Sequence, residues 1–421
     1  MTEFLYESKV AITKPKFDIF VLAFAVLLLI LVGQFIIVTW GGEVFRTVPL
    51  TWNDWLLIIG STSLRLYVNH FRYTYISVFH SMALLLFLFA YETLCVSDLN
   101  PIAILASMST LFCTEILILI PVQFKRQILN FVIKVIQFCV GISLVGWILF
   151  LLKFPLPHYT DASDPYYYHT IYYLFNLNGD PDLQLVPRFA GFFLEPGHLG
   201  TMCVFLLCIN RFRLREFGNK ILLAGVLFSL SLAAYGLLVG AVIIYFIQMR
   251  KIIWIIVFGS LFATVGIISY FYNNGDNVLY QMIFHRIEFE DGEMVGNNRT
   301  SMYFDAEFDK YLSSSKVWTG MGRDAFGSEK NANQNITIGC AGYKRYFFIR
   351  GVLGTVLLLL FLVAYYWNYR SIWTLGFLIV FIVGNLIRDY PLKPIWLYLF
   401  ILFTHFEVRK QINYVGFTYR F

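Results

Sequence analysis

The chain has 421 residues, of which 58% are hydrophobic, 19% aromatic and 14% charged, and its formal net charge is +6. Soluble domains carry about a quarter charged residues, so this composition and a mean hydropathy of +0.67 exclude an ordinary soluble domain. The basic residues lie in short connections between apolar runs. Positive charge placed in this way orients membrane helices, and it gives no indication of nucleic acid as a partner.

Apolar runs recur from residue 17 to residue 406, and a run of about 18 or more apolar residues is typical of a membrane span. They predict an all-α polytopic membrane protein with about twelve transmembrane helices, a single integral membrane domain over residues 1–421. Several of the runs are short for a bilayer crossing. In chain order the predicted spans are Phe17–Trp40, Trp55–Val68, Tyr75–Leu94, Ile102–Ile120, Ile128–Leu152, Leu199–Asn210, Leu222–Tyr235, Leu237–Gln248, Ile252–Tyr270, Phe347–Trp367, Ile372–Ile387 and Ile395–Phe406.

The apolar run Leu222–Gln248 can form one tilted crossing or two short helices that turn near residues 234–236. Two helices place Arg250 and Lys251 on the same membrane face as the basic residues 211–220, which strengthens the positive-inside bias. We therefore predict two helices, with both termini in the cytoplasm. The basic residues that depart from the bias are Arg46, Arg388 and Lys393.

This topology places two long segments outside the cytoplasm, residues 153–196 and 271–345. Both are far longer than a connection between helices needs to be, and long loops of this kind are usually functional. The segment Pro155–Tyr173 mixes prolines and turn residues with a tyrosine cluster, so we predict a loop that lies along the membrane surface. Its tyrosines are typical of an interfacial belt, and a sugar-stacking platform is the alternative.

The stretch Arg188–Gly200 leads from the first long loop into a span. Pro196 suits the first position of a helix, so Glu195 is predicted at the helix mouth, where the helix dipole favours a carboxylate and the free amides can hold a phosphate oxygen. Arg188 adds a planar guanidinium that suits phosphate, and His198 is either a second donor or a residue of the helix face. The simpler alternative is that Glu195 and Pro196 only start the helix.

The second long loop carries His285 and three arginines in a segment rich in Asn, Gly, Asp and Glu, and Arg350 follows near the outer end of the next span. Such charges are ordinary in a solvated loop. Together with Arg188 they also supply the donors that a pyrophosphate needs. Gly320 and Gly322 allow a tight turn or a close approach to a ligand. The three arginines are Arg286, Arg299 and Arg323.

Charged residues also lie inside predicted spans, where they are costly and often functional. Glu115 and Lys134 occupy neighbouring predicted helices, and we expect them to form a buried structural pair. The chain has no nucleotide-binding loop, zinc-protease helix or nucleophile elbow. The segment Asp180-Pro181-Asp182 is more simply a turn than a metal site, so we predict neither a metal nor a cofactor.

The stretch Arg188–Gly197 (RFAGFFLEPG) resembles the R-x-x-G-x-F-x-E-P segment of bacterial O-antigen and polysaccharide repeat-unit polymerases of the Wzy type. The later parts are similar in order: a basic turn, an apolar stretch around Ser231, and Thr319-Gly320-Met321-Gly322 in a long loop. The resemblance implies a GT-C-like, metal-independent glycosyltransferase of the bacterial inner membrane. It implies that undecaprenyl-pyrophosphate-linked oligosaccharide units are joined at the periplasmic face into O-antigen or capsular polysaccharide.

The expected partners are these lipid-linked oligosaccharides, the lipid bilayer and a chain-length regulator. The resemblance implies that Arg188 binds the pyrophosphate of the substrate. It implies the same role for Arg286 and Arg299, whose surrounding residues match the family's motifs more loosely. Glu195 is the expected general base for the acceptor hydroxyl, with His198 behind it. The remaining residues expected to bind substrate are Arg323, Arg350 and His285.

Three alternatives stay open. Related O-antigen ligases carry a histidine shortly before the span that follows the second loop, and residues 323–350 contain none, which favours a polymerase. A flippase for lipid-linked oligosaccharide would use the same arginines along its path, whereas here they cluster in the outer loops. A structural partner in an assembly complex leaves the residues from Arg188 to Gly200 without a role.

Overall fold

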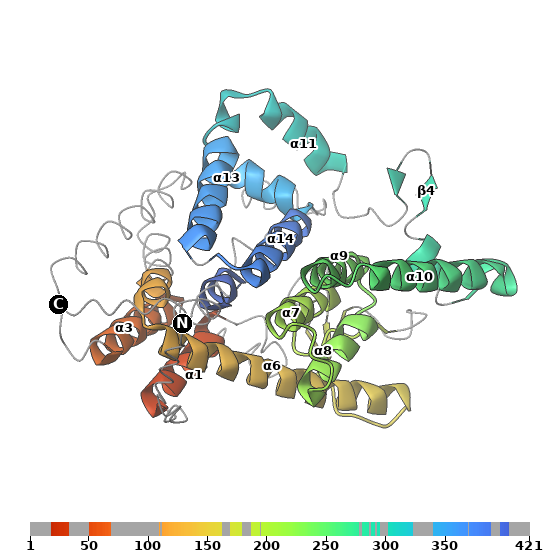
Figure 1. Cartoon of the computed structure of the whole chain (residues 1–421), viewed down its shortest axis with the longest axis horizontal. Coiled ribbons are helices and arrows are strands. Elements are labelled where there is room, and N and C mark those ends of the chain that lie inside the picture. The colour runs from red at the N-terminus through yellow and green to blue at the C-terminus, as the bar shows by residue number, and fades with distance from the viewer. Residues whose placement is uncertain are drawn as a thin grey trace, which may run out of the picture.

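The fold is built almost entirely from helices, as Figure 1 shows. The computed structural model describes residues 18–32, 50–68, 109, 112–161, 169–178, 187–193, 195–277, 280–285, 288–290, 293–294, 302–322, 340–368, 370–388 and 396–403. Residues 112–119 and 396–403 are helical. The named α-helices are α1 (Ile19–Val32), α3 (Leu50–Val68), α6 (Val122–Leu151), α7 (Pro196–Ile209), α8 (Phe217–Phe228), α9 (Leu232–Gln248), α10 (Ile253–Phe271), α11 (Met302–Leu312), α13 (Gly342–Asn368) and α14 (Ile372–Ile387).

The described helices indicate a membrane protein, as predicted. Three helical stretches are long and apolar enough to cross a bilayer: Gln123–Leu151, Ile253–Gly275 and Gly342–Trp367. Shorter apolar helices of 10–17 residues accompany them in the described part of the chain. The number of about twelve spans stays a prediction, because Tyr75–Leu94 and the first part of Ile102–Ile120 lie outside the described residues.

The run Leu222–Gln248 forms two helices, α8 and α9, which confirms the predicted break. The predicted position of the turn, residues 234–236, is wrong: the chain turns earlier, between Phe228 and Leu232. Leu230 adopts a left-handed conformation with φ 44°. Ser231 then caps α9, since its hydroxyl accepts a hydrogen bond from the backbone N–H of Ala234 over 3.5 Å.

Helix α7 forms the centre of the bundle. It is apolar on all sides and is buried along nearly its whole length, as expected for a helix without a solvent face. It packs against α8, α9 and α14. A Cβ atom added at Gly200 would overlap Ala234 at the start of α9, and Gly384 of α14 lies against the ring of Phe205. Small residues thus let the neighbouring helices approach α7 closely.

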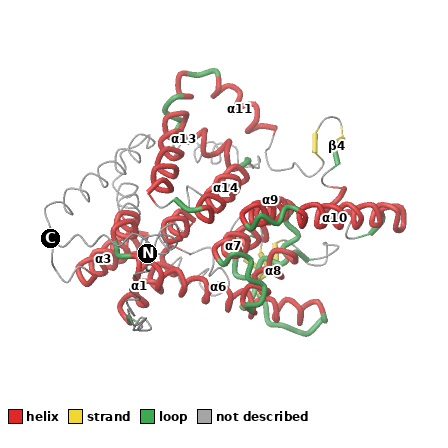
Figure 2. Tube along the Cα trace, in the orientation of Figure 1, coloured by secondary structure: helices red, strands yellow, loops and turns green. Residues whose placement is uncertain are grey.

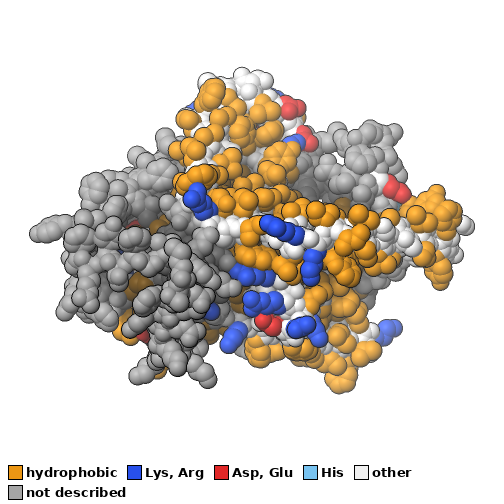
Figure 3. Space-filling model, viewed as in Figure 1, with side chains coloured by type: hydrophobic (Ala, Val, Ile, Leu, Met, Phe, Trp, Pro, Cys, Tyr) orange, Lys and Arg blue, Asp and Glu red, His pale blue; other side chains and the backbone are white. Residues whose placement is uncertain are grey.

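The ends of α7, α9 and α14 meet at one end of the bundle, which we call the basic end. The guanidinium of Arg211 lies 4.5 Å from the ring centroid of Trp373, and the side-chain amide of Gln248 donates to the carbonyl of Ile372 over 2.7 Å. Lys and Arg side chains gather on the surface over α7, α8 and α9 (Figure 3). Because α8 and α9 are separate helices, Arg211 and Arg250 lie at this same end, in agreement with the predicted charge distribution.

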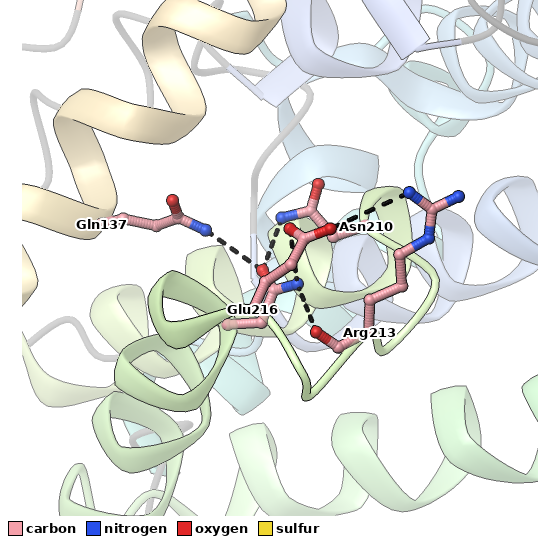
Figure 4. Close-up of polar contacts among 5 residues, drawn as sticks. Gln137, Asn210, Arg213 and Glu216 are labelled. Atoms are coloured by element: carbon pink, nitrogen blue, oxygen red, sulfur yellow. Dashed lines mark hydrogen bonds and ion pairs between the residues drawn. The ribbon is translucent and has the colours of Figure 1, made fainter.

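A buried asparagine, Asn219, fixes the turn between α7 and α8 at the basic end. Its side-chain oxygen accepts hydrogen bonds from Gln137 over 3.1 Å and from Asn210 over 2.7 Å. Its side-chain nitrogen donates to the carbonyl of Arg213 over 3.0 Å, and Glu216 lies beside the same group (Figure 4). These bonds hold the turn against α6.

The first long loop contains a small antiparallel sheet of β1 (Tyr159–Asp161), β2 (His169–Ile171) and β3 (Asn176–Asn178) (Figure 2). In its register Tyr159 faces Ile171 and Thr170 faces Leu177. The sequence did not predict these strands, although their β-branched and aromatic side chains favour strands. The position of this loop along the membrane surface stays a prediction. A second sheet, β4 (Phe289–Glu290) with β5 (Glu293–Met294), lies in the second loop.

The second long loop packs onto the start of α13 through α11 and the 3-10 turn Ser315–Val317. The hydroxyl of Tyr311 donates to the backbone carbonyl of Phe347 over 2.8 Å. Lys344 of α13 forms an ion pair with Asp305 of α11. These contacts surround a separate hydrophobic cluster of Phe304, Phe308, Tyr311 and Phe348.

Helix α13 is broken at Gly351, where φ is 64° and ψ is −171°. The segment 318–322 of the second loop satisfies the backbone groups that the break releases: Met321 N–H donates to Phe348 over 2.8 Å, and Leu353 N–H donates to Trp318 over 3.0 Å. A Cβ atom at Gly320 would overlap the carbonyl of Ile349. Gly320 therefore lies in close contact with the backbone of α13. The predicted close approach of this glycine to a ligand stays a prediction.

The predicted pair of Glu115 with Lys134 is wrong. Glu115 pairs with Arg65 of α3, with 2.8 Å between the guanidinium and the carboxylate, and both side chains are largely buried. Lys134 lies on the exposed face of α6. An aliphatic side chain that ends in an ammonium group can extend toward the headgroups, whereas a buried carboxylate requires a cation beside it.

The break in α13 predicts a strong requirement for glycine at position 351. Gly351→Ala is expected to lower the free energy of unfolding by about 1–3 kcal/mol, because this combination of φ and ψ is essentially restricted to glycine. Thermal unfolding of the purified protein in detergent measures the effect. The control is Gly236→Ala in α9, which has open space around its Cβ position and is expected to be neutral or slightly stabilising. Equal melting temperatures for Gly351→Ala and the unaltered protein would contradict this account of the break.

Candidate functional site

The mouth of α7 carries the resembling stretch, and its geometry agrees with the predicted helix start. Glu195 has extended backbone angles (φ −136°, ψ 148°) and Pro196 is the first helical residue. The backbone carbonyl of Glu195 accepts hydrogen bonds from the N–H groups of His198 and Leu199 over 3.0 and 3.2 Å. The Glu195 carboxylate makes no capping hydrogen bond to the helix, and it points to another partner.

That partner is Arg388, the residue directly after α14. Its Nη1 atom lies 2.6 Å from Oε2 of Glu195, and the exposed fractions of the two side chains are 16% for Arg388 and 41% for Glu195. A short contact of this kind is a charge-assisted hydrogen bond, which is stronger than a neutral one. The sequence did not identify Arg388 as a site residue. In the sequence, Arg388 was distinguished only as a basic residue that departs from the positive-inside bias.

Arg388 joins three helix ends, and we call this end of the bundle the site end. A Cβ atom added at Gly197 would overlap the guanidinium of Arg388, and one added at Gly342 would overlap its backbone. Gly197 lies in the first turn of α7, and Gly342 is the first residue of α13. The C-terminal ends of both long loops therefore come together at Arg388, although they are far apart in the sequence.

Arg188 lies at the turn between α8 and α9. Its Nε atom donates to the carbonyl of Ser229 over 3.2 Å, and the neighbouring Phe189 N–H donates to the carbonyl of Phe228 over 3.0 Å. Ser229 also contacts the second turn of α7, because a Cβ atom at Gly200 would lie 2.9 Å from its hydroxyl oxygen. Arg188 and Glu195 are thus both anchored at the start of α7.

Upstream, Asn176 fixes the backbone of the resembling stretch. Its side-chain amide donates to the carbonyls of Gly191 and Phe193 over 3.0 and 2.6 Å, and its backbone N–H also donates to Gly191. Gly191 has a φ of 58°, a left-handed conformation that favours glycine. The sheet of the first loop therefore holds the stretch against the helices. Sequence reasoning missed Asn176, because its role depends on hydrogen bonds to residues 15 and 17 positions later in the chain.

His198 and Arg350 are both buried, with exposed fractions of 5% and 2%. The burial of His198 within α7 favours the helix-face alternative for this residue. Arg350 lies at the break in α13, about two helical turns beyond Gly342 and beneath the segment 318–322.

His285 belongs to a cluster on the surface of the second loop. Its Nδ1 atom lies 3.0 Å from Oε2 of Glu288, and the other carboxylate oxygen accepts a hydrogen bond from the hydroxyl of Tyr280. These bonds hold the pKa of Glu288 below its usual range and raise the pKa of Tyr280 to about 12. Phe284 packs on Gly266 of α10, so His285 lies beside α10, a helix that extends away from α7 in Figure 1.

The other predicted substrate-binding residues, Arg286, Arg299 and Arg323, lie outside the described residues, as do Asp180 and Asp182. Within the described ranges, the His, Cys, Asp and Glu side chains form no group of three or more that could hold a metal ion. The residues that the structure brings to the mouth of α7 are Arg188, Glu195, His198 and Arg388.

The geometry predicts that Glu195 and Arg388 are energetically coupled. A double-mutant cycle with Glu195→Gln and Arg388→Gln, read as free energies of unfolding in detergent, is expected to give a coupling energy of about 0.5–3 kcal/mol. The matched control is the pair Arg213–Glu216 at the basic end, whose charged groups are 3.9 Å apart and mostly exposed. That pair is expected to give only a few tenths of a kcal/mol. Equal coupling in the two cycles would refute a special role for the Arg388 contact.

The sequence matches no protein-family model, no curated protein and no solved structure at a significant level. The resemblance of the stretch Arg188–Gly197 to repeat-unit polymerases therefore stays a prediction.

Proposed function

We propose that this chain is a GT-C-like polymerase of the bacterial inner membrane. It joins oligosaccharide repeat units carried on undecaprenyl pyrophosphate into O-antigen or capsular polysaccharide, and it uses no metal ion. The observation that carries the proposal is the grouping of Arg188, Glu195 and Arg388 at the mouth of α7, where both long loops rejoin the membrane helices.

The distribution of charge supports a periplasmic site. The basic end carries Arg211 and Gln248 beside the first turn of α14, whereas Glu195 and Arg388 lie at the opposite ends of α7 and α14. Basic residues concentrate on the cytoplasmic side of inner-membrane proteins. In this proposal the site end faces the periplasm, on the same side as the two long loops.

The proposed reaction needs an anion-binding group and a base. The acceptor hydroxyl oxygen forms a bond to the anomeric carbon of the growing chain, and the bond from that carbon to the pyrophosphate oxygen breaks. The electron pair of the broken bond stays on the lipid pyrophosphate, where Arg188 stabilises the growing negative charge. The hydroxyl proton passes to the Glu195 carboxylate, which is partly exposed and can reach substrate.

The proposal is tested with variants of Arg188. Arg188→Ala is expected to abolish long-chain product in cells, and Arg188→Lys to restore little of it, because an ammonium group cannot bind two phosphate oxygens as a guanidinium does. The readout is the length distribution of extracted polysaccharide, with protein level in the membrane measured in parallel. Arg213→Gln at the basic end is the control and is expected to keep normal chain lengths. Normal chain lengths from the Arg188→Lys variant would show that a bidentate contact to phosphate is not required.

An assay with purified protein and lipid-linked repeat units tests the polymerase itself, and Glu195→Gln tests the base. Longer lipid-linked glycans are the expected product of the unaltered protein, and Glu195→Gln is expected to slow their formation by about a hundredfold or more. If the unaltered protein moved lipid-linked units across vesicles without lengthening them, the chain would be a flippase. Full elongation by the Glu195→Gln variant would show that Glu195 is not the base.

A further inference from the structure

We propose that Arg388 is a pyrophosphate-binding residue, and that the Glu195 carboxylate occupies it until an anionic substrate takes the carboxylate's place. The inference rests on the proposed function, and it adds to that function a binding residue that the resembling stretch does not contain. It also assigns a second role to the ion pair at the mouth of α7.

The space around Arg388 is shaped for its guanidinium. Gly197 has no side chain, and a Cβ atom there would overlap Nη2, the atom beside the one that contacts Glu195. The guanidinium therefore lies directly against the first turn of α7. Gly342 similarly leaves room for the backbone of Arg388. Two glycines from separate helices thus place one planar five-donor group at a helix N-terminus, where an anion is favoured from both sides.

The present occupant of that position has the chemistry of the proposed ligand. A carboxylate and a phosphate both accept paired hydrogen bonds from a guanidinium. Glu195 is the weaker competitor for Arg388, because it brings one negative charge and makes no capping hydrogen bond to α7. A pyrophosphate brings more charge and more acceptor oxygens. With 41% of its side chain exposed, Glu195 also has room to move away.

The exchange explains how Glu195 can act as the base in the proposed reaction although an arginine is paired with it in the free protein. A carboxylate that is paired with an arginine is a weak base, because the positive charge stabilises its ionised form. When a pyrophosphate oxygen takes the guanidinium, Glu195 loses that partner and becomes a stronger base beside the bound donor. Substrate binding and activation of the base are thereby linked through Arg388.

The test is binding of inorganic pyrophosphate to the purified full-length protein in detergent, measured by titration calorimetry. Arg388→Gln is expected to weaken binding by about tenfold or more, through loss of a charge-assisted contact. Glu195→Gln is expected to tighten it, because the competing charge is gone while the shape of the side chain is kept. The control variants Arg213→Gln and Glu216→Gln, from the pair at the basic end, are expected to leave the affinity unchanged.

The sign of the Glu195→Gln effect separates exchange from a structural role. An ion pair that only holds the helices together would give unchanged or weaker binding in that variant, and this result would overturn the inference. If Arg388→Gln does not fold, the Glu195→Gln result decides alone. Unchanged affinity in a folded Arg388→Gln variant would also overturn it.

A second arm identifies the source of the pyrophosphate. Farnesyl pyrophosphate, a short isoprenyl analogue, is expected to bind more tightly than inorganic pyrophosphate and with the same dependence on Arg388. Equal affinities for farnesyl pyrophosphate and inorganic pyrophosphate would show that the ligand is not a lipid-linked pyrophosphate. Because the titration involves no sugar transfer, pyrophosphate binding through Arg388 without any lengthening of glycans would refute the polymerase and leave this inference standing.

Discussion

Glu195 and Arg388 are separated by 193 residues, yet their charged groups lie 2.6 Å apart at the point where three helix ends meet. Charges near the apolar part of a membrane are costly unless they are paired. The start of α7 and the end of α14 must therefore stay together for these two charges to remain paired, and the start of α13 packs on the backbone of Arg388. Gly197 and Gly342 make this possible, since any side chain at either position would occupy the space of Arg388.

The rest of the bundle extends from this junction. Helix α7 runs from Glu195 to the basic end, and α8, α9 and α14 pack around it, so a single buried helix connects the two chemically different ends. At the basic end, Asn219 and Trp373 fix the turns that carry the arginines. At the site end, the sheet of the first loop and the segment 318–322 of the second loop are held against helices. Both loops are thus attached to the scaffold close to the candidate site.

Local signals in the sequence predicted local features well. The apolar run Ile372–Ile387 coincides with α14, and Pro196 marks the first residue of α7, because apolar length and a fixed φ act within a few residues. Contacts between distant segments could not be predicted: Arg65 with Glu115, Gly320 with α13, and Arg388 with Glu195. Such pairs depend on helix packing, which no spacing in the sequence encodes. The small sheet of the first loop was missed because its three-residue strands show no alternating pattern.

The central claim is that the site end faces away from the cytoplasm while the basic end faces toward it. The most direct measurement is a pair of reporter fusions of a periplasm-active phosphatase, one joined after Lys251 at the basic end and one after Lys316 in the second loop. The account predicts an inactive fusion at Lys251 and an active fusion at Lys316. Activity at Lys251 with none at Lys316 would place Glu195 and Arg388 on the cytoplasmic side and would contradict the account.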